Sequence, residues 1–158
     1  MVTDSADGAA PIRPPFEVMG EINITRVFDA SRELVFRAWV EREHLERWWG
    51  PHGFTTTNIE MDVIPGGAWH YVMRGPDGND YPFVGMYVEV VEPELIVFEG
   101  AINGSSGFRI WVEVVFSDLG PKSEVKVRQL YSFRAASTKN TLDGWNQQFD
   151  RLAEFLGG

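Results

Sequence analysis

The chain has 158 residues and a mass of 17.9 kDa, which corresponds to one domain of ordinary size. Its 44% hydrophobic and 23% charged residues are typical of a globular protein, and 6 Trp, 4 Tyr and 11 Phe provide large planar side chains for a core. A net charge of −9 without a run of Lys or Arg disfavours binding to nucleic acid or anionic membranes, and zero Cys excludes disulfides, thiolate catalysis and Cys-ligated metals.

The N-terminal segment, residues 1–15, contains acidic residues, Gly and Pro without a hydrophobic period, and is predicted to be a disordered tail. It has neither the basic nor the apolar region of a secretory signal. No stretch of the chain approaches the roughly 20 apolar residues of a membrane span. We therefore expect a cytoplasmic protein in which residues 16–158 form a single domain.

Alternating apolar residues predict a strand over residues 18–28, and two short helices are expected after it. Ser31 has the side chain of an N-cap for the first helix. The second helix is expected to begin near Glu41 and to end at Gly50, because a glycine followed by Pro51 is a common helix end.

The hydrophobic period then becomes two-fold, which predicts six antiparallel strands at residues 54–63, 68–74, 81–92, 94–100, 108–117 and 123–133. Helical spacing returns after Thr138 and predicts a long amphipathic helix over residues 139–156. Gly144 lies within this helix, so we expect a close backbone approach or a need for space there. Because a single long helix must bury its apolar stripe, the predicted fold class is α+β, with a curved antiparallel sheet wrapped around the C-terminal helix.

Six short motifs follow one another in a distinctive order. They are the strand–Asp29-Ala30-Ser31–helix opening, Leu45-x-x-Trp48-Trp49-Gly50-Pro51, Pro65-Gly66-Gly67-Ala68-Trp69, Met73-Arg74-Gly75-Pro76-Asp77-Gly78, Tyr81-Pro82-x-x-Gly85-x-Tyr87-x-Glu89, and Gly144-Trp145 with its helix. Together, over residues 18–156, they resemble the activator-of-heat-shock-ATPase-homologue (AHSA-type) family of the START-like, birch-pollen-allergen-like (SRPBCC) superfamily.

The resemblance implies the helix-grip fold, in which a seven-stranded antiparallel sheet grips the last helix and a cavity between them often holds an apolar, lipid-like ligand. It also implies a possible role in the stress response, with a chaperone as partner. The eukaryotic co-chaperones of the family carry an additional N-terminal domain, for which residues 1–15 leave no room. The family has no common catalytic signature, and fold alone does not define chemistry.

Strand alternation assigns side chains to the inner face of the sheet. On the strand over residues 108–117 two sets compete for that face, and we favour the all-apolar set of Ile110, Val112, Val114 and Phe116. The predicted ligand-binding residues are the inward-facing Trp69, Tyr71, Met73, Phe83, Tyr87 and Glu89, Trp145 and Phe149 from the last helix, and Trp39, Trp48 and Trp49, which would close one end.

Glu89 is the most informative of these residues, because an inward-facing carboxylate must be paired, hydrogen-bonded or protonated. Its functional interpretation is an anchor for a ligand hydroxyl or amine. The alternative is a structural partner for an Arg or a Tyr.

Three functions remain open from the sequence. The leading one is non-enzymatic binding of a small apolar molecule, with solid packing of the same side chains as its structural alternative. The second is a cyclase- or hydrolase-like enzyme that uses Glu89 with Tyr71 or Tyr87 as an acid–base pair. The third is a co-chaperone or regulatory module that binds a chaperone or a second copy of the chain, for which Trp48 and Trp49 could form a docking patch.

No cofactor or metal site is expected. The three histidines, His44, His52 and His70, are scattered, and the chain lacks a P-loop and a dinucleotide-binding fingerprint. The sequence Gly104-Ser105-Ser106-Gly107 is interpreted as a hairpin loop and not as a nucleophile site.

Overall fold

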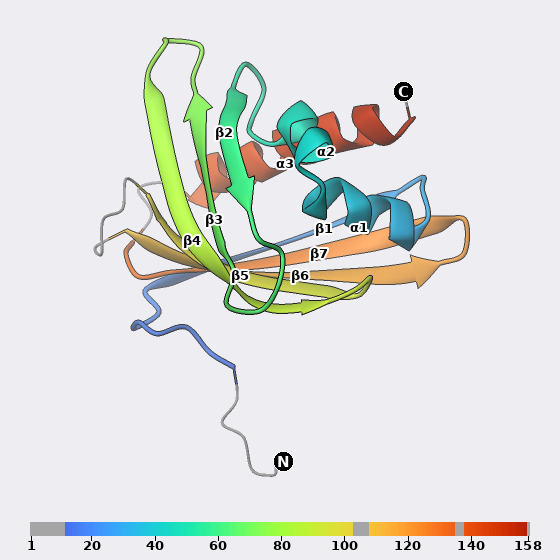
Figure 1. Ribbon diagram of the computed structural model, residues 1–158, viewed down its shortest axis with the longest axis horizontal. Coiled ribbons are helices and arrows are strands. Elements are labelled where there is room, and N and C mark those ends of the chain that lie inside the picture. Colours follow the sequence, from blue (N-terminus) through green and yellow to red (C-terminus); the bar gives the residue numbers. More distant parts are fainter. Residues whose placement is uncertain (1–11, 103–107, 135–137, 158) are drawn as a thin grey trace.

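The computed structural model describes residues 12–102, 108–134 and 138–157, which contain seven strands and three helices (Figure 1). Residues 1–11 of the predicted tail and the predicted hairpin loop at 104–107 lie outside the described residues. In chain order the elements are β1 (Gly20–Phe28), α1 (Arg32–Val40), α2 (Arg42–Trp48), β2 (Thr55–Met61), β3 (Ala68–Arg74), β4 (Asp80–Val91), β5 (Leu95–Ile102), β6 (Arg109–Leu119), β7 (Lys122–Tyr131) and α3 (Thr138–Gly157).

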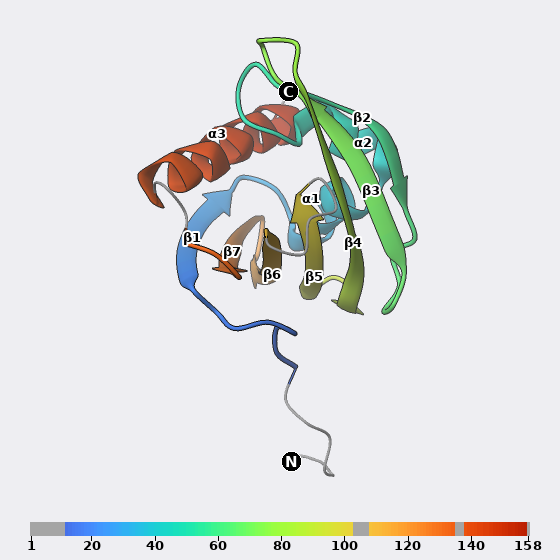
Figure 2. The same ribbon diagram turned by 90° about the vertical axis from the view of Figure 1, so that its left-hand side faces the viewer.

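The strands form one antiparallel sheet in the order β1-β7-β6-β5-β4-β3-β2, so β1 and β2 are its edges. The sheet curves around α3, and the short helices α1 and α2 lie on the same concave side (Figures 1 and 2). Helix α3 packs against β1 at one edge, whereas α2 packs against β2 at the other. The predicted α+β helix-grip architecture is confirmed.

The two short helices are delimited by the expected residues. The Ser31 hydroxyl accepts a hydrogen bond from the Leu34 N–H at 3.3 Å and so caps α1. After α2 the chain turns at Gly50 with a φ of 104°, a conformation that a residue with a Cβ rarely adopts. Arg151 of α3 holds this turn in place, because its guanidinium donates hydrogen bonds to the carbonyl oxygens of Trp49, Gly50, Pro51 and Phe54.

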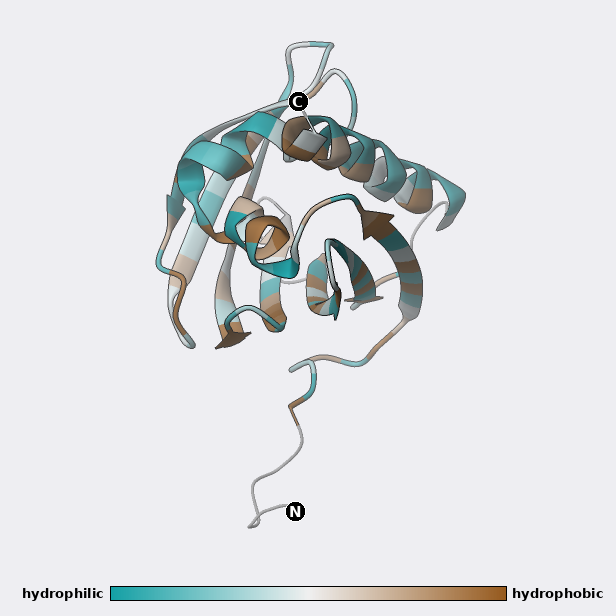
Figure 3. Cartoon of the chain, turned by 90° about the vertical axis from the view of Figure 1, so that its right-hand side faces the viewer, coloured by the Kyte–Doolittle hydropathy of each residue, from teal (hydrophilic) through white to brown (hydrophobic). Residues whose placement is uncertain are grey.

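Side chains on the strands divide between two faces. Val112, Val114 and Phe116 of β6 are buried in the main core, so the favoured set on that strand is confirmed. Trp111 belongs to a smaller cluster on the outer face, with Val97, Leu130 and Phe16. Figure 3 shows apolar and polar residues alternating along the strands and along α3. Among the described residues, no helix has the length and apolar character needed to cross a membrane.

Gly144 does not have the surroundings that we expected. A Cβ built on it would lie 3.7 Å from the Pro51 side chain, which is an ordinary van der Waals distance. The expectation of a close backbone approach or a lack of space in α3 is therefore wrong.

Candidate functional site

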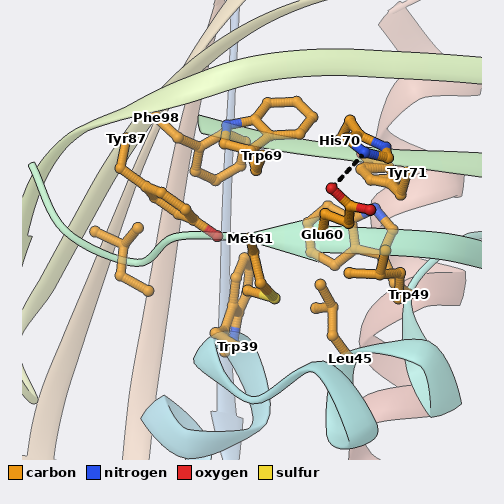
Figure 4. A pocket seen from close by; sticks show the side chains of 12 residues that line it. Trp39, Leu45, Trp49, Glu60, Met61, Trp69, His70, Tyr71, Tyr87 and Phe98 are labelled. Carbon is orange, nitrogen blue, oxygen red and sulfur yellow. Dashed lines mark ion pairs between the residues drawn. The ribbon is translucent and has the colours of Figure 1, made fainter. Parts of the chain in front are cut away.

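A pocket walled mainly by aromatic rings lies between the sheet and the two short helices (Figure 4). Its volume is about 40 Å³, which is enough for a few water molecules. We call it the aromatic pocket. It is lined by Trp39 of α1, Leu45 of α2, Trp49 just beyond α2, Ile59, Glu60 and Met61 of β2, Trp69, His70 and Tyr71 of β3, Tyr87 of β4, and Ile96 and Phe98 of β5.

Two glycines on neighbouring strands provide the seat of Trp69. Gly85 of β4 pairs with both Trp69 of β3 and Gly100 of β5. A Cβ on Gly85 would lie 2.4 Å from the Trp69 ring, and one on Gly100 would lie 2.6 Å from it. Because both positions lack a side chain, the indole lies directly on the backbone of β4 and β5 and forms one wall of the pocket.

A stack of three rings continues this wall. The rings of Trp69 and Tyr71 are 5.4 Å apart and 20° from parallel, and those of Tyr71 and Phe83 are 5.2 Å apart at 19°. Such offset pairs contribute about 0.5–1.5 kcal/mol each beyond the area that they bury. The wall is thus held by the pairing of β3 with β4, in which Tyr71 lies opposite Phe83.

Trp39 anchors the opposite wall. Its ring contacts those of Trp48, Trp49 and Trp145 at 5.0, 5.4 and 6.2 Å. Helix α1, the end of α2 and helix α3 therefore meet at one side chain. The pocket is therefore built between two aromatic assemblies, one on the sheet and one on the helices.

Burial changes the acid–base behaviour of the two tyrosines in the pocket. It raises the pKa of Tyr71 well above the ordinary value of a tyrosine, and a hydrogen bond from the Trp49 side chain offsets only part of this effect. Burial also raises the pKa of Tyr87. Both phenols therefore remain protonated at neutral pH and can serve the pocket as uncharged hydrogen-bonding groups.

The pocket opens at an irregularity in the edge strand β2. The register with β3 shifts between Thr57 and Glu60, and Asn58 has a φ of 54°. Bulges of this kind re-aim side chains at the rims of binding sites. At the opening the Glu60 carboxylate lies 3.2 Å from the His70 imidazole, an ion pair when the imidazole is protonated (Figure 4).

Ten of the eleven predicted ligand-binding residues lie in or next to the core, and they form two groups according to whether they line the aromatic pocket. Trp39, Trp49, Trp69, Tyr71 and Tyr87 line the aromatic pocket. The second group belongs to the core or packs against it without lining the pocket, and consists of Trp48, Met73, Phe83, Trp145 and Phe149.

Glu89 is the exception, and its predicted inward orientation is wrong. The register between β4 and β5 shifts between Tyr87 and Glu89, so that Glu89 lies opposite Val97, a member of the outer-face cluster. Because one extra residue in a strand reverses the side-chain alternation, Val90 packs against the main core in its place. The acid–base pair of Glu89 with Tyr71 or Tyr87 is consequently not assembled.

Several residues of the pocket were absent from the predicted site. Alternation over residues 54–63 assigns Ile59 and Met61 to the inner face together with Val63, although the predicted ligand-binding set does not include them. Glu60 of β2 lies beside the bulge in that strand, whose position the sequence does not reveal, and His70 of β3 is its partner across the two strands. The remaining residues missed are Leu45, Ile96 and Phe98. Within the described part of the chain, no group of three His, Asp or Glu side chains could hold a metal ion.

Comparisons with known proteins find one matching family and several solved structures with a similar fold. The model of the family described as Activator of Hsp90 ATPase homolog 1-like protein matches residues 29–157. No protein of curated function shows significant sequence similarity to the chain.

Solved structures agree with the family match. A protein from Chromobacterium violaceum has 25% sequence identity and a TM-score of 0.81, with 87% of this chain and 97% of that chain covered. A protein from Arthrobacter aurescens has 20% identity and a TM-score of 0.78, covering 87% and 86%. The AHSA1 protein from Silicibacter pomeroyi has 20% identity and a TM-score of 0.74, covering 87% and 98%.

Proposed function

The chain belongs to the Activator of Hsp90 ATPase homolog 1-like family, of START-like fold, and from this premise we propose that it binds a small apolar molecule in the aromatic pocket without catalysing a reaction. The observation that carries the proposal is the concentration of aromatic side chains around an opening between the sheet and the helices. Apolar walls with a few polar groups are the usual composition of a small-molecule site.

The pocket is too small for an ordinary ligand, so binding requires a side chain to move. Its volume of about 40 Å³ is far below the roughly 300 Å³ of a typical ligand site. Met61 is half-buried at the end of the edge strand β2 and lies in the middle of the pocket in Figure 4. Since an unbranched methionine side chain changes rotamer easily, we infer that a ligand enters by displacing it.

A fluorescence titration with N-phenyl-1-naphthylamine, an apolar probe, tests this function. We expect saturable binding with one probe per chain. Met61→Ala should bind at least about fourfold more tightly, because each additional buried CH₂ equivalent contributes about 0.8 kcal/mol.

Met86→Ala is the matched control for this titration. Met86 is 42% exposed on β4 and does not line the pocket. It lies between Gly85, which contacts the Trp69 ring, and Tyr87, which lines the pocket. Its substitution should leave probe affinity unchanged. Absence of saturable binding to both the parent chain and Met61→Ala, with near-ultraviolet circular dichroism showing a folded protein, would contradict the proposed function.

A second candidate function, docking to a chaperone, is favoured by the outer face of the sheet. Val84 and Met86 are neighbours on one face of β4 and are 44% and 42% exposed. Exposed apolar side chains that lie together are a common feature of protein interfaces. Retention of an Hsp90-type chaperone by the immobilised chain, and its loss in Val84→Asp, would support this function.

A further inference from the structure

Two of the six tryptophans carry a buried indole N–H that has no hydrogen-bond partner among the described residues, namely Trp39 and Trp69. Both side chains are more than nine-tenths buried, and both line the aromatic pocket. The other four indoles are paired: Trp48 with the Ala38 carbonyl at 2.9 Å, Trp111 with Glu113 at 3.0 Å, Trp145 with Gln129 at 2.7 Å, and Trp49 with Tyr71.

The two tryptophans with unpaired N–H groups are both pocket residues. Buried polar groups are nearly always hydrogen-bonded, because a donor removed from water without a partner is destabilising. Trp39 comes from α1 and Trp69 from β3, so the two side chains that carry the unpaired donors lie on opposite walls of the same pocket (Figure 4). A ligand that brings an acceptor between these walls forms hydrogen bonds whose donors have already lost their water.

Charge at the opening restricts the kind of acceptor. Among the described residues no Lys or Arg lines the pocket, and the imidazole of His70 already faces the Glu60 carboxylate. Immediately outside, the depression next to the opening contains Glu43 and Glu46 with a single Arg42. A carboxylate or phosphate ligand would therefore lose its hydration without gaining a free cation in exchange.

We propose, as a refinement that rests on the proposed function, that the aromatic pocket selects uncharged carbonyl compounds. The ligand class consists of molecules with an apolar body and a ketone, ester or amide oxygen. The indole N–H groups of Trp39 and Trp69 are the hydrogen-bond donors to that oxygen.

Three compounds with nearly the same shape test the selection by calorimetric or NMR titration: cyclohexyl methyl ketone, its hydrocarbon analogue isopropenylcyclohexane, and cyclohexanecarboxylate. In a pocket without free donors the hydrocarbon would bind best, because burying an unpaired carbonyl is costly. With two free donors we expect the ketone to bind about tenfold more tightly than the hydrocarbon and the carboxylate to bind more weakly than the ketone.

The N–H signals of the six indoles provide a direct readout in the parent chain. We expect the ketone to shift the Trp39 and Trp69 signals downfield, whereas the hydrocarbon should not. Trp111 lies on the outer face with its N–H already paired, so its signal serves as the internal reference. Loss of the ketone preference in Trp39→Phe and Trp69→Phe, but not in Trp111→Phe, would assign the donors, and the signals of the parent chain suffice if a variant fails to fold.

The outcomes separate the two proposals. Hydrocarbon binding that equals or exceeds ketone binding overturns the carbonyl selection and leaves the apolar binding function intact. Failure of all three compounds and of N-phenyl-1-naphthylamine to bind the folded chain and Met61→Ala overturns both. A ketone preference that persists in both Trp39→Phe and Trp69→Phe overturns the assignment of the donors.

Discussion

Gly85 and Gly100 decide where Trp69 lies. They pair across β4 and β5, and the absence of two side chains there leaves a flat surface of backbone on which an indole rests. A glycine in a strand interior weakens the strand, so its presence at two paired positions indicates a gain elsewhere. That gain is the burial of Trp69, which is 7% exposed and forms one wall of the aromatic pocket.

The substitution Gly85→Ala tests this arrangement. Its Cβ would lie 2.0 Å from the Glu99 carbonyl oxygen, which belongs to the backbone of the paired strand and cannot move aside easily. We expect the free energy of unfolding to fall by about 3 kcal/mol, at the upper end of the cost of overpacking. Urea denaturation provides the measurement.

Val84→Ala is the control for this substitution. Val84 precedes Gly85 on the same strand but is 44% exposed, so its truncation should cost less than about 1 kcal/mol. If Gly85→Ala were no more destabilising than Val84→Ala, Trp69 would not depend on the glycine seat.

At the scale of elements, α3 contains Gly144 at a position that has room for a side chain. Within the described part of the chain, a Cβ at position 144 would meet Pro51 alone, at an ordinary distance of 3.7 Å. Gly144→Ala should therefore raise the free energy of unfolding by about 0.5–1 kcal/mol, because alanine loses less backbone entropy in a helix. The measurement is the shift of the urea midpoint at constant m-value.

Gly78→Ala makes the same chemical change in a different backbone conformation. No atom of the described residues lies within 4 Å of a Cβ built at position 78, but the φ of Gly78 is 85°. It should lower the free energy of unfolding by about 1 kcal/mol, since alanine is strained in the left-handed region. Equal effects at positions 78 and 144 would show that backbone conformation does not account for the difference.

The elements themselves could be predicted because each carries its own periodicity and end signals, such as Ser31 before α1 and Gly50 after α2. What the sequence could not reveal is where a strand bulges. The alternation along β4 places Tyr87 correctly, but the register shift after it turns Glu89 to the outer face. Contacts between distant elements were also inaccessible, as with Arg151, which holds the turn after α2.

The same limit applies to the candidate site. Local alternation located the aromatic residues Trp69, Tyr71 and Tyr87, because inward-facing rings on a half-buried sheet follow a two-residue period. The lining residues Ile59, Glu60 and Met61 lie at or beside a bulge in β2, and the glycine seat depends on the pairing of β4 with β5. Both are properties of strand register, which one sequence does not specify by itself.

On the scale of the whole molecule, the pocket follows from the unequal covering of the sheet. Helix α3 packs on β1, α1 on β6 and β7, and α2 on β2. Over β3, β4 and β5 aromatic side chains fill the space, among them Trp69, Tyr87 and Phe98. The rings of Trp69 and Phe98 meet edge to face at 89°, and both line the aromatic pocket on this part of the sheet.

Because these phenols are buried in the core, the free energy of unfolding depends on pH in the alkaline range. Burial raises the pKa of Tyr71 and Tyr87, so between their folded values and the ordinary tyrosine value of about 10 the folded chain binds more protons than the unfolded one. The free energy of unfolding is therefore highest below about pH 10 and falls above it, by at most about 1.4 kcal/mol per pH unit for each tyrosine. Urea denaturation from pH 8 to pH 11 measures this slope. Tyr87→Phe removes one of the three phenols whose pKa burial raises, the third being Tyr131, and should flatten the fall. An unchanged slope would show that the unfolded and folded states ionise the Tyr87 phenol alike.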